Sequence, residues 1–262
     1  MLFYTAMRYL KKTFKMGIVL FLIGITLACS TSHTTKALNR HVTIMPLGDS
    51  ITYGVDGLHP VDGLHLANNG GYRLLLWNTL VREGADIDYV GSQKSGPNTF
   101  DTANEGHPGY RIDQIAANIF DWLNTYRPNF ILLHIGTNDI AQNDDVADAP
   151  ARLSNLIGQI TTTVPNATLI VAQILPIANP ILNAEVETYN AAIPSIVQSW
   201  TAQGKHVHYV DMYDAVPVSD LPDGIHPTNQ GYGLMANVWN TALIPLLPSI
   251  TASLSPSICT EV

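Results

Sequence analysis

The sequence is short of cysteine and of positive charge. Of its 262 residues, two are cysteines, Cys29 and Cys259, and 13% are charged. The first forty residues contain six of the 13 lysines and arginines and no acidic residue, which leaves seven basic against 21 acidic side chains in the remainder. Because phosphate recognition needs a basic stripe, we expect no nucleic-acid partner. The acidic charge would also repel an acidic polymer and mildly favours a neutral polysaccharide. An acidic surface that maintains solubility explains the same charge and is the preferred account of it.

Metal- and nucleotide-binding motifs are missing as well. The chain has no His-x-x-x-His spacing, no phosphate-binding glycine loop and no complete EF-hand pattern. Asn143-Asp144-Asp145 and the loop at Asp56 carry oxygen ligands of the kind calcium prefers, but solvated loops have the same composition. We therefore expect neither a metal nor another cofactor.

The N-terminal residues have the composition of an export signal. Basic residues precede an apolar run from Met16 to Ala28, which is too short to span a bilayer but typical of a signal peptide. The basic residues are Arg8, Lys11, Lys12 and Lys15. We predict that residues 1–29 direct export, giving a secreted protein or a membrane-anchored bacterial lipoprotein.

The processing of this leader has several alternatives. Leu27-Ala28-Cys29 resembles the end of a lipobox, which would place a lipid on Cys29, although Thr26 stands where that pattern prefers leucine. Cleavage after Ala28 and an uncleaved anchor are the other readings. Apart from such an anchor we expect no membrane contact. A lipidated Cys29 would leave Cys259 single, whereas in an oxidising compartment the two could form a disulfide.

The rest of the chain is long enough for one large domain. A hydrophobic content of 46% is that of a globular protein. We predict a Ser- and Thr-rich linker at residues 30–40, a domain at 41–248 and a flexible tail at 249–262. We expect the protein to be a monomer.

Short apolar runs alternate with stretches of helical spacing. Buried strands are predicted at Val42–Leu47, Ile87–Val90, Phe130–Ile135, Thr168–Leu175 and His206–Val210. Helices are predicted at Tyr72–Glu83, from Ile112 to before Pro128, around Leu153–Ile160, at Val186–Trp200 with a bend near Pro194, and from about Gln230. Residues 91–109 lack periodicity and are expected to form a long loop. The alternation predicts an α/β fold with a parallel sheet covered on both faces, whose ligands bind at the carboxyl ends of the strands.

The first of these strands ends in a turn that carries a serine. Gly48-Asp49-Ser50 follows the apolar run directly, so the Ser50 hydroxyl would be held by rigid backbone, as a nucleophile requires. A hydroxyl is a poor nucleophile at neutral pH. Such a serine therefore needs a histidine base, a group that orients the base, and donors for the oxyanion.

Four sequence blocks together resemble those of the SGNH, or GDSL, hydrolases. In chain order they are Gly48-Asp49-Ser50-Ile51-Thr52, His107-Pro108-Gly109-Tyr110, Gly136-Thr137-Asn138-Asp139 and Asp223-Gly224-Ile225-His226-Pro227. The resemblance runs from about Val42 to Leu247. It implies a three-layer α/β/α sandwich with a five-stranded parallel sheet in the flavodoxin-like order 2-1-3-4-5.

Two further stretches indicate which group of these hydrolases the chain resembles most. Tyr89-Val90-Gly91-Ser92-Gln93 and Glu105-Gly106-His107-Pro108-Gly109 are most similar to the family 3 carbohydrate esterases, which include acetylxylan esterases. The similarity implies a serine esterase that removes O-acetyl groups from a polysaccharide, xylan first, or from small acetyl esters, through an acyl-enzyme. A GDSL lipase, a lysophospholipase or another short-chain carboxylesterase is an alternative. A surface lipoprotein that binds carbohydrate without catalysis is an alternative of another class.

His226 is the candidate general base, and Asp223 the residue that orients it. Asp223 lies three residues before His226, on a turn bracketed by Pro222 and Pro227, and can reach back to the imidazole. The tandem segment Val55-Asp56-Gly57-Leu58-His59-Pro60-Val61-Asp62-Gly63-Leu64-His65 repeats the Asp-x-x-His spacing. We expect Asp56–His59 and Asp62–His65 to be surface turns, with contacts at the substrate rim as the alternative.

Donors for the oxyanion are expected from the other blocks. They are the backbone N–H groups of Ser50 and Gly109 and the side-chain amide of Asn138, which cannot titrate. Tyr53, Arg73 and Tyr110 are candidates for substrate binding, although aromatic residues in loops also serve packing and Arg73 would equally suit a structural ion pair. His134 is expected to be a core histidine and Asp139 to fix a loop.

Overall fold

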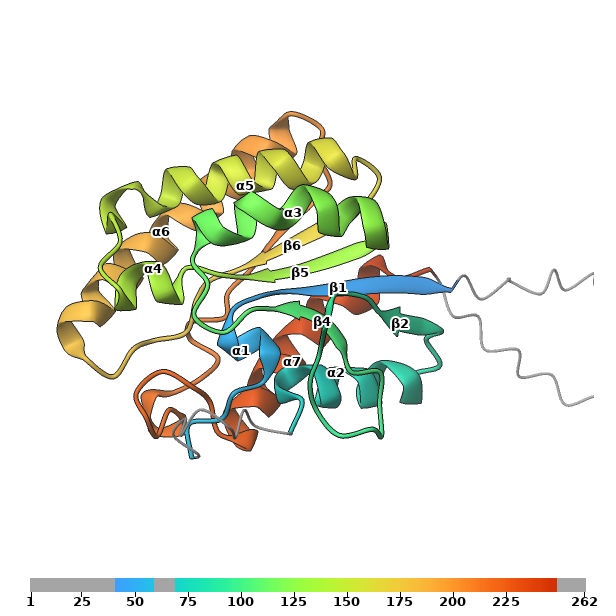
Figure 1. The fold of residues 1–262 in the computed structure, drawn as a ribbon, viewed down its shortest axis with the longest axis horizontal. Helices are drawn as coiled ribbons and strands as arrows, with labels where there is room; N and C mark the ends of the chain where they lie inside the picture. Colours follow the sequence, from blue (N-terminus) through green and yellow to red (C-terminus); the bar gives the residue numbers. More distant parts are fainter. Residues whose placement is uncertain (1–40, 59–68, 249–262) are drawn as a thin grey trace, which may run out of the picture. The chain divides into compact units, whose positions relative to one another are not determined.

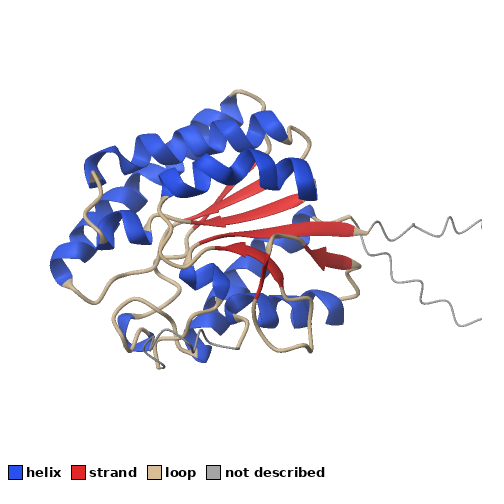
Figure 2. Ribbon diagram, in the orientation of Figure 1, coloured by secondary structure: helices blue, strands red, loops and turns tan. Residues whose placement is uncertain are grey.

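The computed structural model describes residues 41–58 and 69–248, whose fold is shown in Figures 1 and 2. The predicted leader, linker and tail lie outside these residues, as do both cysteines and the His59–Leu66 part of the tandem repeat. No helix in the described part of the chain is long and apolar enough to cross a membrane.

A mostly parallel sheet forms the middle layer (Figure 2). Its parallel strands lie in the order β2-β1-β5-β6-β7, which confirms the predicted flavodoxin-like arrangement. Their bounds are β1 Val42–Gly48, β2 Ile87–Tyr89, β5 Phe130–His134, β6 Thr168–Ala172 and β7 Val207–Val210.

Within residues 41–58 and 69–248, the sheet has seven strands rather than the predicted five. The additional strands, β3 (Gln93–Lys94) and β4 (Ala103–Gly106), lie in the stretch predicted to be a loop. β4 pairs in parallel with the carboxyl half of β1, beyond the point where β2 ends its pairing, and β3 pairs antiparallel with β4. The prediction missed them because the strand residues Asn104 and Glu105 are polar, yet both are fully buried.

Helices cover both faces of the sheet (Figure 1). One face carries α3, α4, α5 and α6, and the other carries α1, α2 and α7. The helices are α1 Ser50–Tyr53, α2 Gly71–Arg82, α3 Ile112–Tyr126, α4 Thr137–Ala141, α5 Ala149–Thr163, α6 Pro180–Ala202 and α7 Asn229–Leu243, with short 3-10 turns at Val146–Asp148, Val218–Asp220 and Ile244–Leu246.

Strands β1, β5, β6 and β7 each contribute to two hydrophobic cores. In β1, Met45 and Leu47 pack with α3, α5 and α6, whereas Val42 and Ile44 pack with α2 and α7. Successive side chains of a strand point to opposite faces, so a strand between two helical layers must be apolar on both. This explains why the strands are continuous apolar runs in the sequence.

Helix α6 begins earlier than its hydrophobic spacing predicts. Asn179 accepts hydrogen bonds from the Ile181 and Leu182 N–H groups, and Pro180 occupies the first turn, where its missing N–H costs nothing. The helix therefore starts at Pro180 rather than Val186, and it runs through Pro194.

Candidate active site

The strand register brings three of the four sequence blocks to one edge of the sheet. Gly48, the last residue of β1, pairs with Gly106 of β4 on one side and with His134 of β5 on the other. The His107 N–H then donates to the Gly48 carbonyl at 2.9 Å. The segments that follow these strands therefore begin side by side at the carboxyl edge of the sheet.

Ser50 is held at the start of a short helix. Asp49 precedes it as the N-cap and accepts the Ile51 N–H at 2.9 Å. The helix ends after one turn at Gly54, whose φ of 96° suits glycine. Ser50 is 9% exposed, and as the first residue of α1 its N–H has no acceptor within the helix.

Ser50, His226 and Asp223 form a continuous hydrogen-bonded chain. The Ser50 Oγ lies 2.8 Å from His226 Nε2, and His226 Nδ1 lies 2.6 Å from Asp223 Oδ2. The other carboxylate oxygen, Oδ1, accepts the backbone N–H groups of Ile225 and His226 at 2.9 and 2.7 Å. This is the arrangement that general-base activation of a serine requires.

Asp223 is poised to remain ionised beside His226. Partial burial alone would raise its pKa, but the His226 N–H, the His226 imidazole and the Ile225 N–H outweigh burial, and the pKa of Asp223 is lowered overall. An ionised Asp223 can stabilise the imidazolium that forms when His226 accepts a proton.

The structure also describes the surroundings of the two other predicted oxyanion donors. Gly109 has a φ of 83°, which favours glycine, although a Cβ there would meet nothing within 4 Å. One side-chain N–H of Asn138 donates to the Tyr110 carbonyl at 3.0 Å, which leaves the second for another acceptor. Their action on an oxyanion stays a prediction.

Arg73 does not occupy a position that could contact substrate. Its side chain is fully buried on α2 and lies over the Phe100 ring at 5.6 Å. Its guanidinium donates to the carbonyls of Thr52, Tyr53, Ser95 and Thr102 and to the Ser95 hydroxyl. Arg73 therefore has a structural role in place of the predicted substrate contact. Its guanidinium N–H groups donate to these acceptors, and its side chain is shielded from solvent. The carbonyls tie the segment after the nucleophile to the loop before β4.

Tyr53 and Tyr110 are both partly exposed near the proposed chemistry. Tyr53 ends α1, the helix that begins with Ser50, and Tyr110 follows Gly109 directly. Their roles as substrate contacts remain predictions.

Asp139 and His134 are core residues. The Asp139 carboxylate is fully buried and accepts the Ile112 N–H at 3.1 Å and Arg152 at 2.9 Å, which confirms its predicted structural role. His134 is fully buried, and burial lowers its pKa to about 4, so it is a neutral core histidine.

One acidic cluster exists among the residues that the structure describes. Carboxylate oxygens of Asp113, Asp139 and Asp144 lie within 4.8 Å of one another. Two arginines reach into the cluster: Arg111 lies 3.0 Å from Asp144, and Arg152 lies 2.9 Å from Asp139. These cations offset the acidic charge, so the cluster has a structural explanation.

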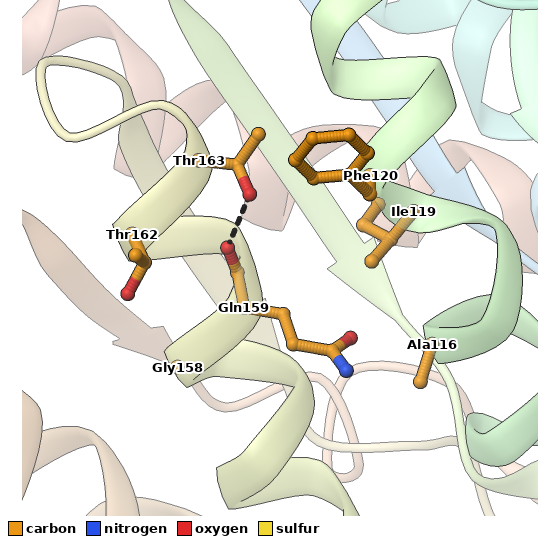
Figure 3. Close-up of a pocket in the computed structure, with 7 residues that line it drawn as sticks. All are labelled: Ala116, Ile119, Phe120, Gly158, Gln159, Thr162 and Thr163. Carbon is orange, nitrogen blue, oxygen red and sulfur yellow. Dashed lines mark hydrogen bonds between the residues drawn. The ribbon is translucent and has the colours of Figure 1, made fainter.

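A groove between α3 and α5 lies apart from the proposed chemistry (Figure 3). It is lined by Ala116, Ile119, Phe120, Gly158, Gln159, Thr162 and Thr163. None of the candidate catalytic residues contributes to it.

Gly57 of the tandem repeat contacts the Asp223–His226 turn, which the sequence did not predict. A Cβ on Gly57 would lie 2.5 Å from the His226 carbonyl oxygen and 3.0 Å from Asp223 Oδ1. Gly57, in the first copy of the repeat, therefore packs directly against this turn. A glycine in a repeated Asp-Gly pair was the only sequence signal for it.

Known proteins resemble this chain in sequence and in fold. A family model described as "GDSL-like Lipase/Acylhydrolase family" matches residues 47–234. A family 3 carbohydrate esterase from Clostridium thermocellum is 39% identical, with a TM-score of 0.68 over 79% of this chain and 98% of that one. A family 3 carbohydrate esterase from Talaromyces cellulolyticus is 27% identical, with a TM-score of 0.65 and the same coverage.

The curated relatives are longer than the matched region. A multidomain esterase from Ruminococcus flavefaciens is 30% identical over 227 residues, which are 76% of this chain and 28% of that protein. The chain spans less than two thirds of the length of the curated relatives it matches, at 63% and 28%.

Proposed function

The chain belongs to the GDSL-like lipase/acylhydrolase family, and on this basis we propose that it is a serine esterase that removes O-acetyl groups from a polysaccharide, with xylan the first to test. The observation that carries the proposal is the chain of contacts from Ser50 Oγ to His226 Nε2 at 2.8 Å and from His226 Nδ1 to Asp223 at 2.6 Å. This geometry suits a nucleophile, a general base and a group that orients the base.

In the first half of the reaction, His226 Nε2 takes the Ser50 hydroxyl proton as Oγ attacks the acetyl carbonyl carbon. The carbonyl oxygen becomes an oxyanion, which the Ser50 and Gly109 N–H groups and the Asn138 amide would stabilise. The carbon–oxygen bond to the sugar then breaks, and the sugar oxygen takes the proton from His226. The products are a free sugar hydroxyl and an acetyl group on Ser50.

In the second half, water replaces the sugar. His226 takes a proton from the water as its oxygen attacks the acetyl-serine, and the same donors hold the second oxyanion. Collapse releases acetate and returns the proton to Ser50 Oγ. Asp223 stays ionised through both halves and stabilises the imidazolium each time.

The choice of an acetylated carbohydrate rests on similarity to the two family 3 carbohydrate esterases. The acidic charge of the chain also favours a neutral polysaccharide, because a neutral polymer would approach it without electrostatic repulsion. A lipase or lysophospholipase would instead prefer long acyl chains, which makes acyl-chain preference the decisive measurement.

Export and anchoring are further parts of the proposal. Residues 1–29 would direct the protein out of the cytoplasm, with a lipid on Cys29 or cleavage after Ala28 as the two processed forms. The mass of the N-terminal peptide isolated from the native host distinguishes these forms. We propose that the exported domain is a monomer.

Acetate release from acetylated xylan tests the function. We expect the wild-type protein to release acetate, and Ser50→Ala and His226→Ala to lose at least about 10³-fold in kcat. A His59→Ala/His65→Ala double variant should stay active, because the chemistry is assigned to Asp223 and His226 and not to the repeated Asp-x-x-His spacing. Activity that persists without Ser50 would overturn the mechanism.

The acyl series decides the substrate class. Wild-type protein should prefer acetyl over longer esters of one alcohol. A preference for chains of about eight carbons or more would reject the acetyl-sugar assignment in favour of a lipase, since only an extended apolar channel stabilises such chains.

A further inference from the structure

A tight turn carries Gly109, one of the proposed oxyanion donors. The Tyr110 N–H donates to the His107 carbonyl at 3.0 Å, Pro108 is the second residue of the turn, and Gly109 is the third, with a φ of 83°. This is the sequence and backbone pattern of a type II turn. The direction of the Gly109 N–H therefore depends on how firmly the two ends of the turn are held.

Aromatic stacking holds those ends. The His107 and Tyr110 rings stack on each other, with centroids 4.7 Å apart and planes at 21°. The Trp122 ring of α3 stacks on the same imidazole at 4.6 Å and 10°. Two rings on one imidazole fix its plane and connect the turn to a long helix.

A buried carboxylate fixes the imidazole within that plane. His107 Nε2 lies 2.7 Å from Glu105 Oε1, and the Glu105 side chain is fully buried. The Ser92 N–H and hydroxyl also donate to Glu105, at 2.8 and 2.6 Å. A buried carboxylate is costly unless it is fully hydrogen-bonded, so the His107 contact is expected to be held tightly.

The turn that carries Gly109 is also hydrogen-bonded to Asn138. Asn138 Nδ2 donates to the Tyr110 carbonyl at 3.0 Å, and Gln142 Nε2 donates to the Gly109 carbonyl at 2.9 Å. Both donors come from the α4 segment, on the other side of the site. A shift of the turn would therefore move the Gly109 N–H and, through the Tyr110 carbonyl, the Asn138 amide.

We propose that His107, clamped by Glu105 and Trp122, is a positioning residue that aims the Gly109 N–H and the Asn138 amide at the oxyanion. The proposal rests on the proposed function, since it presupposes that Ser50 attacks an ester. His107 acts through the turn and does not touch the substrate carbonyl. The clamp then contributes to the stabilisation of the transition state and little to the binding of the ground state.

Turnover of 4-nitrophenyl acetate by the whole chain tests the clamp. Trp122→Leu removes one stacking ring and leaves the Glu105–His107 contact intact, so the buried carboxylate keeps its partner. We expect kcat to fall about 10-fold for Trp122→Leu and about 100-fold for His107→Leu, with KM within about twofold of wild type. Phe120→Leu, an exposed ring on the same helix, is the matched control and should match wild type.

A double-variant cycle separates positioning from a general loss of stability. If the clamp acts through the oxyanion donors, the fall in kcat caused by Trp122→Leu should be smaller in an Asn138→Ala background than in wild type. Trp122→Phe, which keeps a ring, should restore most of the turnover.

Two results would overturn the inference. One is a kcat for Trp122→Leu equal to that of Phe120→Leu, and the other is a fall of the same factor with and without Asn138. In either case Ser50-dependent hydrolysis by wild type would leave the proposed function standing. A wild-type chain without esterase activity would refute the proposed function and this inference together.

Discussion

Asp49 and Asp223 are carboxylates close to His226, and their surroundings act on them in opposite directions. Asp223 accepts hydrogen bonds from the His226 ring and backbone, and its pKa is lowered. Asp49 is completely buried, and burial raises its pKa to about 6 despite the Ile51 N–H and the nearby His226. The carboxylate that partners the base is therefore the one that stays ionised most readily.

The raised pKa of Asp49 predicts a pH-dependent effect of Asp49→Asn on stability. Folding favours the protonated form of Asp49. The ionised side chain therefore lowers the free energy of unfolding once the pH rises above 3.8, the pKa in the unfolded state, and the loss is complete above a pH of about 6. That rise corresponds to about 3 kcal/mol. Asp49→Asn should therefore be more stable than wild type at pH 8, while Oδ1 of the new amide still caps Ile51.

Denaturant unfolding of both proteins at pH 8 and pH 4 measures this effect. The stability difference should shrink as the pH falls towards 4, because Asp49 is then protonated in the folded wild type. Asp223→Asn is the contrasting variant, and it should lose stability at pH 8. A difference for Asp49→Asn that stays constant between the two pH values would contradict the assignment.

Connecting loops hold Gly109, Asp223 and His226, whereas Ser50 and Asn138 lie at the starts of the short helices α1 and α4. The Pro222–His226 turn carries the general base His226 and its orienting partner Asp223, and two other loops contact it. Gly57 lies against both Pro222 and His226, at the two ends of the turn, and the Ala178 N–H donates to the Gly224 carbonyl at 2.9 Å. The Tyr232 hydroxyl of α7 donates to the Val55 carbonyl, which ties the first copy of the tandem repeat to the helix that follows the turn.

Gly57→Ala should disturb catalysis through this contact. The added methyl group would lie 2.5 Å from the His226 carbonyl oxygen, a backbone atom that can move only with the turn. A displacement of the base by about 1 Å can cost about 10²-fold, so we expect a fall of that size in kcat/KM for a small acetyl ester.

Gly233→Ala is the matched control for Gly57→Ala. Its Cβ would lie 3.6 Å from Leu75 Cδ1, an ordinary contact, and α7 should gain slightly from the alanine. Wild-type activity in Gly57→Ala, together with an unchanged melting temperature, would show that the turn is not braced by the repeat.

Strand β1 is an inner strand of the sheet. It pairs with β2 and β4 along one edge and with β5 along the other, and its side chains enter both hydrophobic cores. All strands and helices of the described part of the chain lie between residues 41 and 248. The domain bounds at residues 41 and 248 stay a prediction.

Residues 41–248 expressed alone should fold and keep the esterase activity of the longer chain. The reason is that both cores and the proposed catalytic residues lie within this range. Circular dichroism melting and turnover of 4-nitrophenyl acetate measure the outcome. A variant that starts at residue 47 should not fold, because it lacks most of β1. If residues 41–248 melt well below the melting temperature of the longer chain, the predicted boundaries are wrong.

The sequence alone determined the α/β class, the parallel strand order through its family resemblance, and the grouping of Ser50 and His226 in recognisable blocks. These features are local: an apolar run predicts a buried strand, and Gly48-Asp49-Ser50 or Asp223-x-x-His226 can be read within a few residues. Only the tertiary structure decided that Arg73 is a buried structural cation, that polar Glu105 lies in a strand, and that Gly57 and His107 touch the site. The physical reason is that burial and long-range contacts, which join residues far apart in the chain, override local composition and leave almost no local pattern.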